Sequence, residues 1–260
     1  MTHDINETLR QPLIDLLLSA ADDKLFLGHA NADWTGLAPI LEEDIAFSSL
    51  AQDDLAHALA WYELVGELSG RSADAVAYGR PAQEYRCARL VTVPDEFDWA
   101  LALVRQFFCD HFEQIRLGRL VQSAFEPVRT RAARMFAEEA LSIGHADQWI
   151  IRLARGTSES RERLQTALDR LAPLAPELFE PTPGVALLEQ AGYYPRARQA
   201  DFDLWREAVE NVLAAATVSA PFAPLPPNFV GGRNGLHTPE FAAQLDELTE
   251  VYRVEPEAAW

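Results

Sequence analysis

The chain has 260 residues, 48% of them hydrophobic, which is enough for one large domain or two small ones with a substantial core. Its formal net charge of -18, from 40 acidic and 22 basic residues, argues against a nucleic-acid binder and against unaided binding to anionic lipid, because both need a basic surface. The chain opens with no signal segment, and no apolar run reaches the ~20 residues of a membrane helix, so we expect a cytoplasmic protein.

Two long helices are predicted in the N-terminal part of the chain, over residues 7–29 and 41–68. Gly36 and Pro39 separate them, and Gly70 ends the second. Each has an apolar stripe whose members recur at steps of three and four residues. The stripes are Leu13, Leu16, Ala20, Asp23 and Leu27 in the first helix, and Phe47, Leu50, Asp54, His57, Trp61 and Leu64 in the second.

A mixed connector leads to a second pair of long helices, predicted over residues 97–124 and 128–154. Pro94 closes the connector, and Asp95 and Glu96 are placed to favour the next helix N-terminus. The stripes here are Leu103, Phe107, Asp110, Gln114, Leu117 and Val121 in the third helix, and Met135, Glu139, Ser142, Ala146 and Trp149 in the fourth.

The rest of the chain has shorter helices and many prolines and glycines. A short helix starts at Thr157 or Ser158, another runs over residues 201–216, and a final one begins at "HTPEF" with Thr238 as N-cap and Pro239 at its first position. "FEPTPGVALLEQAGYYP" is rich in loop residues, and the composition of "SAPFAPLPPNFVGGRNG" excludes regular structure. The sequence therefore predicts an all-α bundle with a partly irregular C-terminal extension.

One carboxylate lies within the apolar stripe of each long helix. Asp23 and Asp54 are 31 residues apart, and Asp110 and Glu139 are 29 residues apart, so each helical hairpin brings its two carboxylates to similar heights. Burying an isolated carboxylate is costly. Four of them at equivalent depths therefore indicate a shared cation or a network of paired groups.

Di-iron carboxylate bundles take a carboxylate from each of two helices and a Glu-x-x-His pair from each of the other two. "DDLAH" supplies Asp54 and His57 at this spacing, which directs both side chains to one face. In the fourth helix "EEALS" gives Glu139 and then Ser142 where the second histidine is needed, while His145 points elsewhere. The predicted metal site is a remnant of the di-iron type, with candidate ligands Asp54, His57, Asp110, Glu139 and Asp23.

The same residues have interpretations that need no metal. A lone Asp-x-x-His pair on a helix is more often a hydrogen-bonded core pair than a pair of ligands. A shift of one residue makes Asp22 or Lys24 the inward residue in place of Asp23, and a buried lysine can replace a metal by pairing with carboxylates. His111 follows Asp110 directly and points about 100° away from it, so it is not a candidate ligand.

Several segments resemble the PaaC family, the structural subunits of ring-1,2-phenylacetyl-CoA epoxidases. They are "DDKLFLGH", "LEEDIA", "LAQDDLAH", "WYELVGEL", "FDWALALVRQFF" and "GGRNGLHTPEF". The resemblance covers nearly the whole chain and is most specific over residues 22–44 and 231–260. It implies a single ferritin-like domain over residues 1–260, with a core bundle at about 7–156 and C-terminal helices and extension at about 157–260.

The resemblance also implies a function. It predicts a non-catalytic subunit of a bacterial monooxygenase that epoxidises the ring of phenylacetyl-CoA in phenylacetate catabolism. A PaaA-like catalytic subunit then holds the di-iron centre, further components complete a hetero-oligomer, and this chain needs no catalytic residue or cofactor of its own. Family members have an apolar residue and glutamine where this chain has Asp54 and His57, which are similar to the catalytic paralogue's Gln-Asp-Glu-x-x-His. The alternative is therefore a metal-binding ferritin-like oxidase or oxygenase with iron at the remnant site.

The C-terminal part contains the candidate partner contacts. "FAPLPPNFV" and Trp260 suit a groove of the partner subunit, and packing of the loop over its own bundle is an equal alternative. Arg233, in "GGRNG", is a candidate contact for the CoA thioester, although a structural role in the glycine-rich turn is preferred.

Overall fold

A computed structural model describes residues 5–225, 227–256 and 258 of the chain. All regular structure in these residues is α-helix or 3₁₀-helix, without a strand, which confirms the all-α prediction and is consistent with a ferritin-like fold. Within this described part, no helix is long and apolar enough to cross a membrane.

The chain divides into two compact units. The first contains Met1–Pro94, Pro181–Leu188 and Val230–Trp260, and the second contains Asp95–Glu180 and Glu189–Phe229. The C-terminal segment therefore returns to the N-terminal helices, although most of the second unit lies between them in the sequence. The prediction of a single domain over residues 1–260 stays a prediction.

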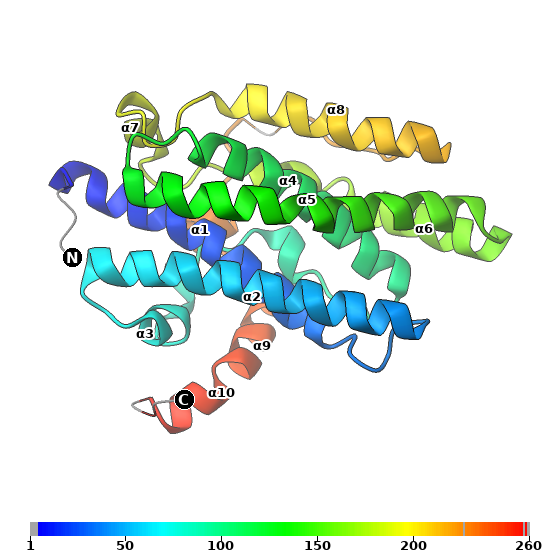
Figure 1. Cartoon of the computed structure of the whole chain (residues 1–260), viewed down its shortest axis with the longest axis horizontal. Coiled ribbons are helices and arrows are strands. Elements are labelled where there is room, and N and C mark those ends of the chain that lie inside the picture. The colour runs from blue at the N-terminus through cyan, green and yellow to red at the C-terminus, as the bar shows by residue number, and fades with distance from the viewer. Residues whose placement is uncertain (1–4, 226, 257, 259–260) are drawn as a thin grey trace. The chain divides into compact units, whose positions relative to one another are not determined.

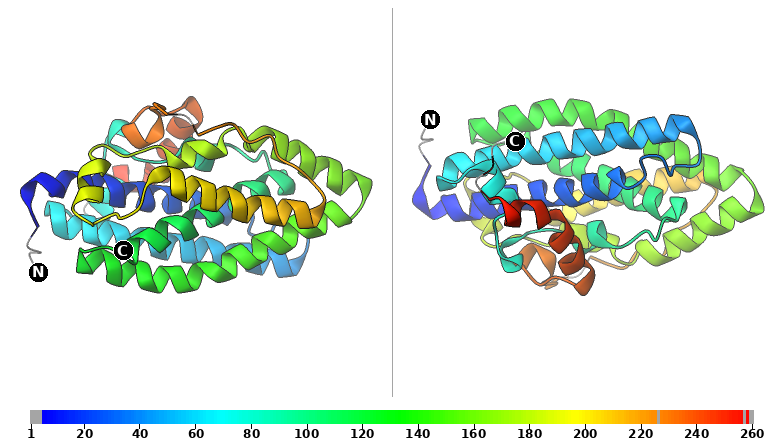
Figure 2. Two further views of the ribbon diagram at one scale, coloured as in Figure 1. Left: turned by 90° about the horizontal axis from the view of Figure 1, so that it is seen from above. Right: turned by 90° about the horizontal axis from the view of Figure 1, so that it is seen from below.

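A long hairpin of α1 (Glu7–Ala32) and α2 (Leu41–Ser69) dominates the first unit, and the two helices lie side by side in all views (Figures 1 and 2). The remaining elements of this unit are short. They are α3 (Ala73–Ala77), the 3₁₀ turns η1 (Ala82–Glu84), η2 (Arg89–Thr92) and η4 (Gly232–Asn234), the first part of α7 (Val185–Gln190), and the C-terminal helices α9 (Pro239–Leu248) and α10 (Glu250–Val254).

Helix α1 is buried on every side from Leu13 to Gly28. One face packs on α2, and η2 of the connector also lies against the helix. The ring of Phe26 stacks on Phe241 of α9 with centroids 5.0 Å apart, and it meets Tyr85 edge-on at 6.2 Å. The C-terminal segment is thus part of the core of the first unit, because it covers a side of α1 that α2 leaves open.

Two glycines of "GGRNG" let this segment approach the connector closely. A Cβ at Gly232 would lie 1.9 Å from the Cys87 carbonyl oxygen, and one at Gly235 would lie 2.3 Å from the Gln83 carbonyl oxygen. Gly235 also has a φ of 78°, which disfavours other residues. Residues 232–234 form the turn η4, so the prediction that this stretch has no regular structure was wrong for these three residues.

The second unit contains the hairpin of α4 (Trp99–Leu120) and α5 (Glu126–Arg155) (Figure 1). Helix α4 is buried on all sides from Ala100 to Glu113, and it packs on α5, α6 and α8. The other elements are α6 (Ser158–Leu171), η3 (Ala175–Phe179), α8 (Arg198–Ala216) and the end of α7 (Val185–Gln190). A cluster of aromatic rings fills its core: Phe108, Phe112, Phe179, Phe202 and Trp205.

Helix boundaries follow the predicted caps at some positions and not at others. Thr157, one of the two predicted starts, caps α6, and Thr238 caps α9 as predicted. Helix α4 begins at Trp99 and not at residue 97, because Asp98 accepts hydrogen bonds from the amides of residues 100 and 101 while Phe97 has a φ of 56°. Helix α7 lies in a stretch that was predicted to be rich in loops.

Candidate functional site

Asp54 and His57 both lie on the buried face of α2. Asp54 accepts a hydrogen bond from Nζ of Lys24 at 2.8 Å and another from Nδ2 of Asn31 at 3.1 Å, both from α1. Gly28 lets the two helices approach at this level, since a Cβ there would lie 3.1 Å from Cβ of Asp54. The buried lysine therefore supplies the positive charge that a carboxylate needs at this depth.

Asp23 points to another part of the first unit. Its two oxygens accept hydrogen bonds from Nη1 and Nη2 of Arg233 at 2.7 and 2.6 Å, and Oδ1 also accepts the amide of Ala88 at 2.9 Å. Two parallel bonds of this kind are the strong geometry for a guanidinium and a carboxylate. The structure confirms the structural role predicted for Arg233, and Asp23 and Asp54 are neutralised by separate cations.

Asp22, the residue before, has a third set of partners. It accepts hydrogen bonds from Nη1 and Nη2 of Arg80 at 3.2 and 2.5 Å, from the hydroxyl of Tyr62 at 2.7 Å and from the amide of Arg86 at 2.6 Å. Burial raises the pKa of Tyr62 well above its ordinary value, and the charge of Asp22 raises it further. Burial alone would lower the pKa of Arg80, but Asp22 and the nearby tyrosines outweigh this effect. Arg80 therefore keeps its charge and Tyr62 its proton.

The sequence left open which of Asp22, Asp23 and Lys24 points inward, and the structure buries all three. Successive helical residues point about 100° apart, so this is possible only on a helix that is covered on every side. Arg80 was not singled out from the sequence. It lies in an irregular connector, where no periodic pattern marks a side chain as buried.

The predicted ligands of the second unit are buried as well. Asp110 on α4 accepts a hydrogen bond from Nε2 of Gln106, one turn earlier on the same helix. Glu139 and Ser142 lie on the buried face of α5, while His145 is half-buried. The serine hydroxyl cannot replace the imidazole nitrogen of a di-iron ligand set, so the departure seen in the sequence persists in the fold.

His111, which the sequence did not give as a candidate ligand, contacts a carboxylate of α5. Its Nε2 is 2.8 Å from a carboxylate oxygen of Asp147 on α5, and its ring meets Phe107 edge-on with centroids 4.9 Å apart. The contact with Asp147 joins α4 to α5 within the second unit, and the contact with Phe107 lies within α4.

Arg119 is the centre of a buried polar cluster in the second unit that the sequence did not reveal. Its Nη1 lies 2.8 Å from Oδ2 of Asp201, and its Nη2 lies 2.9 Å from Oε1 of Glu189. Its guanidinium also donates to the carbonyl oxygens of Tyr194 and Pro195 and covers the ring of Tyr194 at 3.4 Å. Burial raises the pKa of Asp201 although Arg119 opposes the change. The cluster ties the segment before α8 to α4, which is a structural role.

The carboxylates of α1 and α2 do not fit a metal centre in this arrangement. A metal ion needs several free lone pairs that point to one position. The Asp54 oxygens instead face an ammonium group and an amide, and those of Asp23 face a guanidinium. Among the residues that the structure describes, no group of three or more His, Cys, Asp or Glu side chains could hold a metal ion. Iron binding by the five candidate residues stays a prediction.

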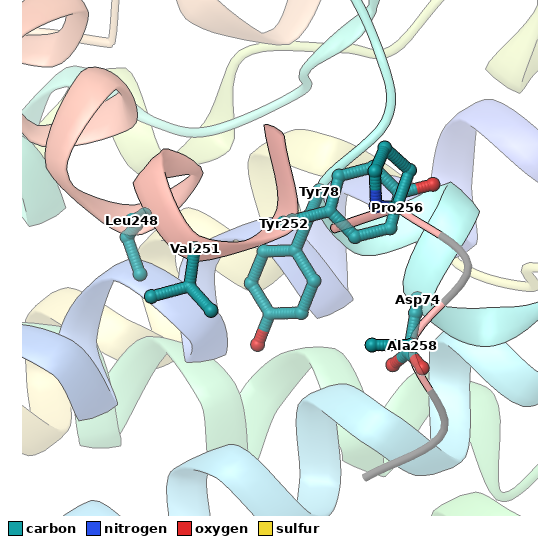
Figure 3. Close-up of a pocket in the computed structure, with 7 residues that line it drawn as sticks. All are labelled: Asp74, Tyr78, Leu248, Val251, Tyr252, Pro256 and Ala258. Carbon is teal, nitrogen blue, oxygen red and sulfur yellow. The ribbon is translucent and has the colours of Figure 1, made fainter. Parts of the chain in front are cut away.

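Two cavities of the first unit lie away from these residues. One, of about 310 Å³, lies between α3 and the C-terminal helices, where Tyr78 and Tyr252 face each other near Val251 and the carboxylate of Asp74 (Figure 3). The other, of about 320 Å³, has a mixed lining of apolar and charged side chains. Its charged lining residues are Asp15, Arg71, Arg80, Glu84 and Arg86.

The loop "FAPLPPNFV" packs partly on its own unit. The ring of Phe222 meets Phe108 and Trp205 edge-on, with centroids 5.6 and 5.3 Å apart. This supports the alternative in which the loop covers its own bundle. Trp260, the other candidate partner contact, lies outside the described residues.

Comparison with known proteins gives two matches that cover nearly all of the chain. A family model described as "Phenylacetic acid catabolic protein" matches residues 1–260. The chain is also similar to the C component of the 1,2-phenylacetyl-CoA epoxidase of Escherichia coli (strain K12), with 28% identity over 246 residues. This alignment covers 94% of the chain and 97% of the E. coli protein.

Proposed function

Because the chain belongs to the family of phenylacetic acid catabolic proteins, we propose that it is the non-catalytic C-type component of a 1,2-phenylacetyl-CoA epoxidase. Its similarity to the C component of the E. coli enzyme extends over nearly the full length of both proteins, which supports an equivalent place in the complex. The family match confirms the resemblance noted in the sequence.

The observation that carries this proposal is the pairing of Asp54 with Lys24. A catalytic subunit of the di-iron type needs carboxylates that are free to bind metal. Here Asp54 is held by a lysine ammonium at 2.8 Å, and Asp23 is held by Arg233 at 2.6 Å. The chain's own cations thus occupy the positions where a metal ion would have to supply positive charge, which supports a structural role.

The charge of the chain supports the assignment of substrate binding to its partner subunit. A CoA thioester is anionic, and a chain of net charge -18 attracts it poorly. We therefore assign substrate binding and the di-iron centre to a PaaA-like catalytic subunit, with this chain as its tightly bound partner in a hetero-oligomer.

A single reconstitution experiment tests the proposal. This chain and the catalytic subunit are expressed separately and together in iron-supplemented medium, and each preparation is analysed by size-exclusion chromatography, for iron content and for turnover of phenylacetyl-CoA with the reductase. We expect the two chains to co-elute, the iron to follow the catalytic subunit, and this chain alone to be inactive. A chain that stays separate from the catalytic subunit would contradict the proposal.

The competing function is a metal-binding oxidase or oxygenase, and the shared buried face of Asp54 and His57 favours it. The same experiment decides between the two functions. Stoichiometric iron in this chain alone, lost in the His57→Ala variant, would establish the competing function.

A further inference from the structure

The outward face of α2 has an apolar stripe of its own. It consists of Leu41, Ile45, Ser48, Gln52, Leu55 and Leu59, which follow one another at steps of four, three, four, three and four residues. Leu50 of the buried stripe comes nine residues after Leu41 and so lies about 180° around the helix from it. Large aliphatic side chains therefore occur on both sides of α2, whereas the outer face of a surface helix is normally polar.

The aliphatic members of this outward stripe are exposed to solvent. The exposed fraction is 70% for Leu41, 64% for Ile45, 48% for Leu59 and 39% for Leu55. Leu37, in the turn before α2, adds to the stripe with 58% exposure. From residue 41 to residue 59 the stripe extends for about 27 Å at the rise of an α-helix. Monomeric proteins rarely expose so much apolar surface in one place, and where they do, it commonly marks an interaction site.

The charges of α2 have a single sign. The helix contains seven acidic residues and no lysine or arginine. Three helices of the second unit instead have Arg–Glu ion pairs four residues apart on their surfaces. These pairs are Arg134–Glu138 on α5, Glu159–Arg163 on α6 and Arg206–Glu210 on α8. Glu43 and Asp54 are buried on the opposite face, so the outward stripe of α2 is flanked by the remaining five acidic residues and by no lysine or arginine of the same helix.

We propose that this outward stripe of α2 is the docking surface for a helix of the catalytic subunit, one with an aliphatic stripe flanked by lysines and arginines. The proposal rests on the proposed function, because it assigns the surface to a partner in the same complex. A second copy of this chain is a poorer occupant, since it would bring two acidic helices together.

The spacing of the stripe suits a helix as the occupant. Alternating steps of four and three are the spacing of a heptad repeat, at which two helices pack side by side with a crossing angle of about 20°. The middle of the stripe is polar: the hydroxyl of Ser48 lies 2.9 Å from that of Thr35, and Gln52 is exposed. A polar position within such a seam specifies register, so the partner helix should present a polar residue opposite Gln52.

Binding to the purified catalytic subunit tests the proposal. The test variant is Ile45→Gln/Leu59→Gln, which keeps the helix propensity and approximate length of both side chains. We expect it to weaken the Kd by about 100-fold, because a few large apolar side chains that become buried in an interface dominate its energy. The variant Asp53→Lys/Glu63→Lys, which reverses two flanking charges, should slow association and lower its dependence on salt. Leu141→Gln on α5 is the matched control, since Leu141 is 81% exposed, and it should bind as the wild type does.

The outcomes separate this inference from the proposed function. Failure of the wild-type chain to bind the catalytic subunit argues against the proposed function itself. Wild-type binding that both α2 variants retain, or that Leu141→Gln weakens as much as they do, overturns the docking surface and leaves the proposed function standing. A wild type that dimerises, with the α2 variants monomeric, overturns the assigned occupant. Thermal unfolding checks that each variant is folded, and the single substitution Ile45→Gln replaces the double variant if that is unfolded.

Discussion

Asp22, Asp23 and Lys24 follow one another in α1, and each is buried beside a different partner of opposite charge. The partners are Arg80 in the connector, Arg233 near the C-terminus and Asp54 on α2. A buried ion pair is weak evidence for stability, but removing one partner strands the other charge in the core. Replacing a single member of one of these pairs should therefore destabilise the fold more than replacing both members together.

Replacing Arg233 by alanine should destabilise the first unit strongly. Asp23 would keep the amide of Ala88 but lose both guanidinium bonds, and breaking a buried pair in this way costs about 3–5 kcal/mol. Urea unfolding of Arg233→Ala measures the loss. Arg253→Ala is the matched control, because Arg253 pairs with Asp246 at the surface and should contribute less than about 1 kcal/mol. Equal effects of the two substitutions would contradict the structural role of Arg233.

The sequence predicts that the candidate ligand residues are buried, but it does not predict which residues pair with them. Helical periodicity places Asp23, Asp54, Asp110 and Glu139 on buried faces, and all four are buried. The pairing of Asp23 with Arg233 was not predictable, because periodicity describes one helix at a time and these residues are 210 positions apart. The sequence suggests Lys24 as an alternative to a metal. Its contact with Asp54 was not predictable, because the contact depends on which side of α1 faces α2.

At the scale of elements, the glycines of η4 determine whether the C-terminal segment can reach the connector. A Cβ at Gly232 would overlap the Cys87 carbonyl oxygen at 1.9 Å, and that oxygen belongs to the backbone and cannot rotate away. The turn would have to move as a whole. Movement of the turn would also displace Arg233, the next residue along.

Gly232→Ala should therefore lower the unfolding free energy, by an amount similar to the loss of the Arg233 pair, about 3 kcal/mol. Gly144→Ala on α5 is the matched control, because no atom lies within 4 Å of a Cβ there. Alanine in the interior of a helix should raise stability by about 0.5–1 kcal/mol. Urea unfolding of both variants measures the two changes, and a Gly232→Ala variant as stable as the wild type would show that the close approach is relaxed in solution.

The long helices were predictable as elements, and the short ones were not. The four long helices have strong periodic stripes, and their bounds agree with the prediction to within a few residues. Elements such as α3 and η1 have only three to five residues, too few for a period to be seen. Helix α7 was missed because Pro181, Pro183 and Gly184 precede it and Gly192 follows it closely.

At the scale of the whole molecule, four tyrosines with raised pKa values predict a loss of stability at alkaline pH. Burial raises the pKa values of Tyr62, Tyr78, Tyr85 and Tyr194 in the folded chain. In the unfolded chain a tyrosine ionises near pH 10. Above that pH the unfolded state loses protons that the folded state keeps. Stability is therefore fully present below pH 10 and falls as the pH rises towards the folded-state values.

We expect Tyr62→Phe to reduce this alkaline loss. Each tyrosine that stays protonated only in the folded state lowers the unfolding free energy by about 1.4 kcal/mol per pH unit above its unfolded-state pKa. Without Tyr62 the slope should be shallower by about this amount. Urea unfolding between about pH 9 and pH 11 gives both slopes. The same slope in the wild type and the variant would show that Tyr62 ionises in the folded chain.

The division into two units was not predictable from the sequence. Predicted helices and loops give no sign that residues 181–188 and 230–260 belong with the N-terminal hairpin. The contacts that place them there involve particular side chains, such as Phe241 on Phe26 and Gln244 on the carbonyl oxygen of Thr92. Neither lies in a repeated pattern.

The pairing of Asp23 with Arg233 also sets an order of events during synthesis. Asp23 leaves the ribosome early, and its partner is added 210 residues later. At the usual rates of translation this delay lasts roughly 10–40 s. During that time α1 lacks two contacts of the folded unit, the pairing of Asp23 with Arg233 and the packing of Phe26 on Phe241. The buried side of α1 that holds Asp23 can therefore be completed only after the segment with Arg233 has been made.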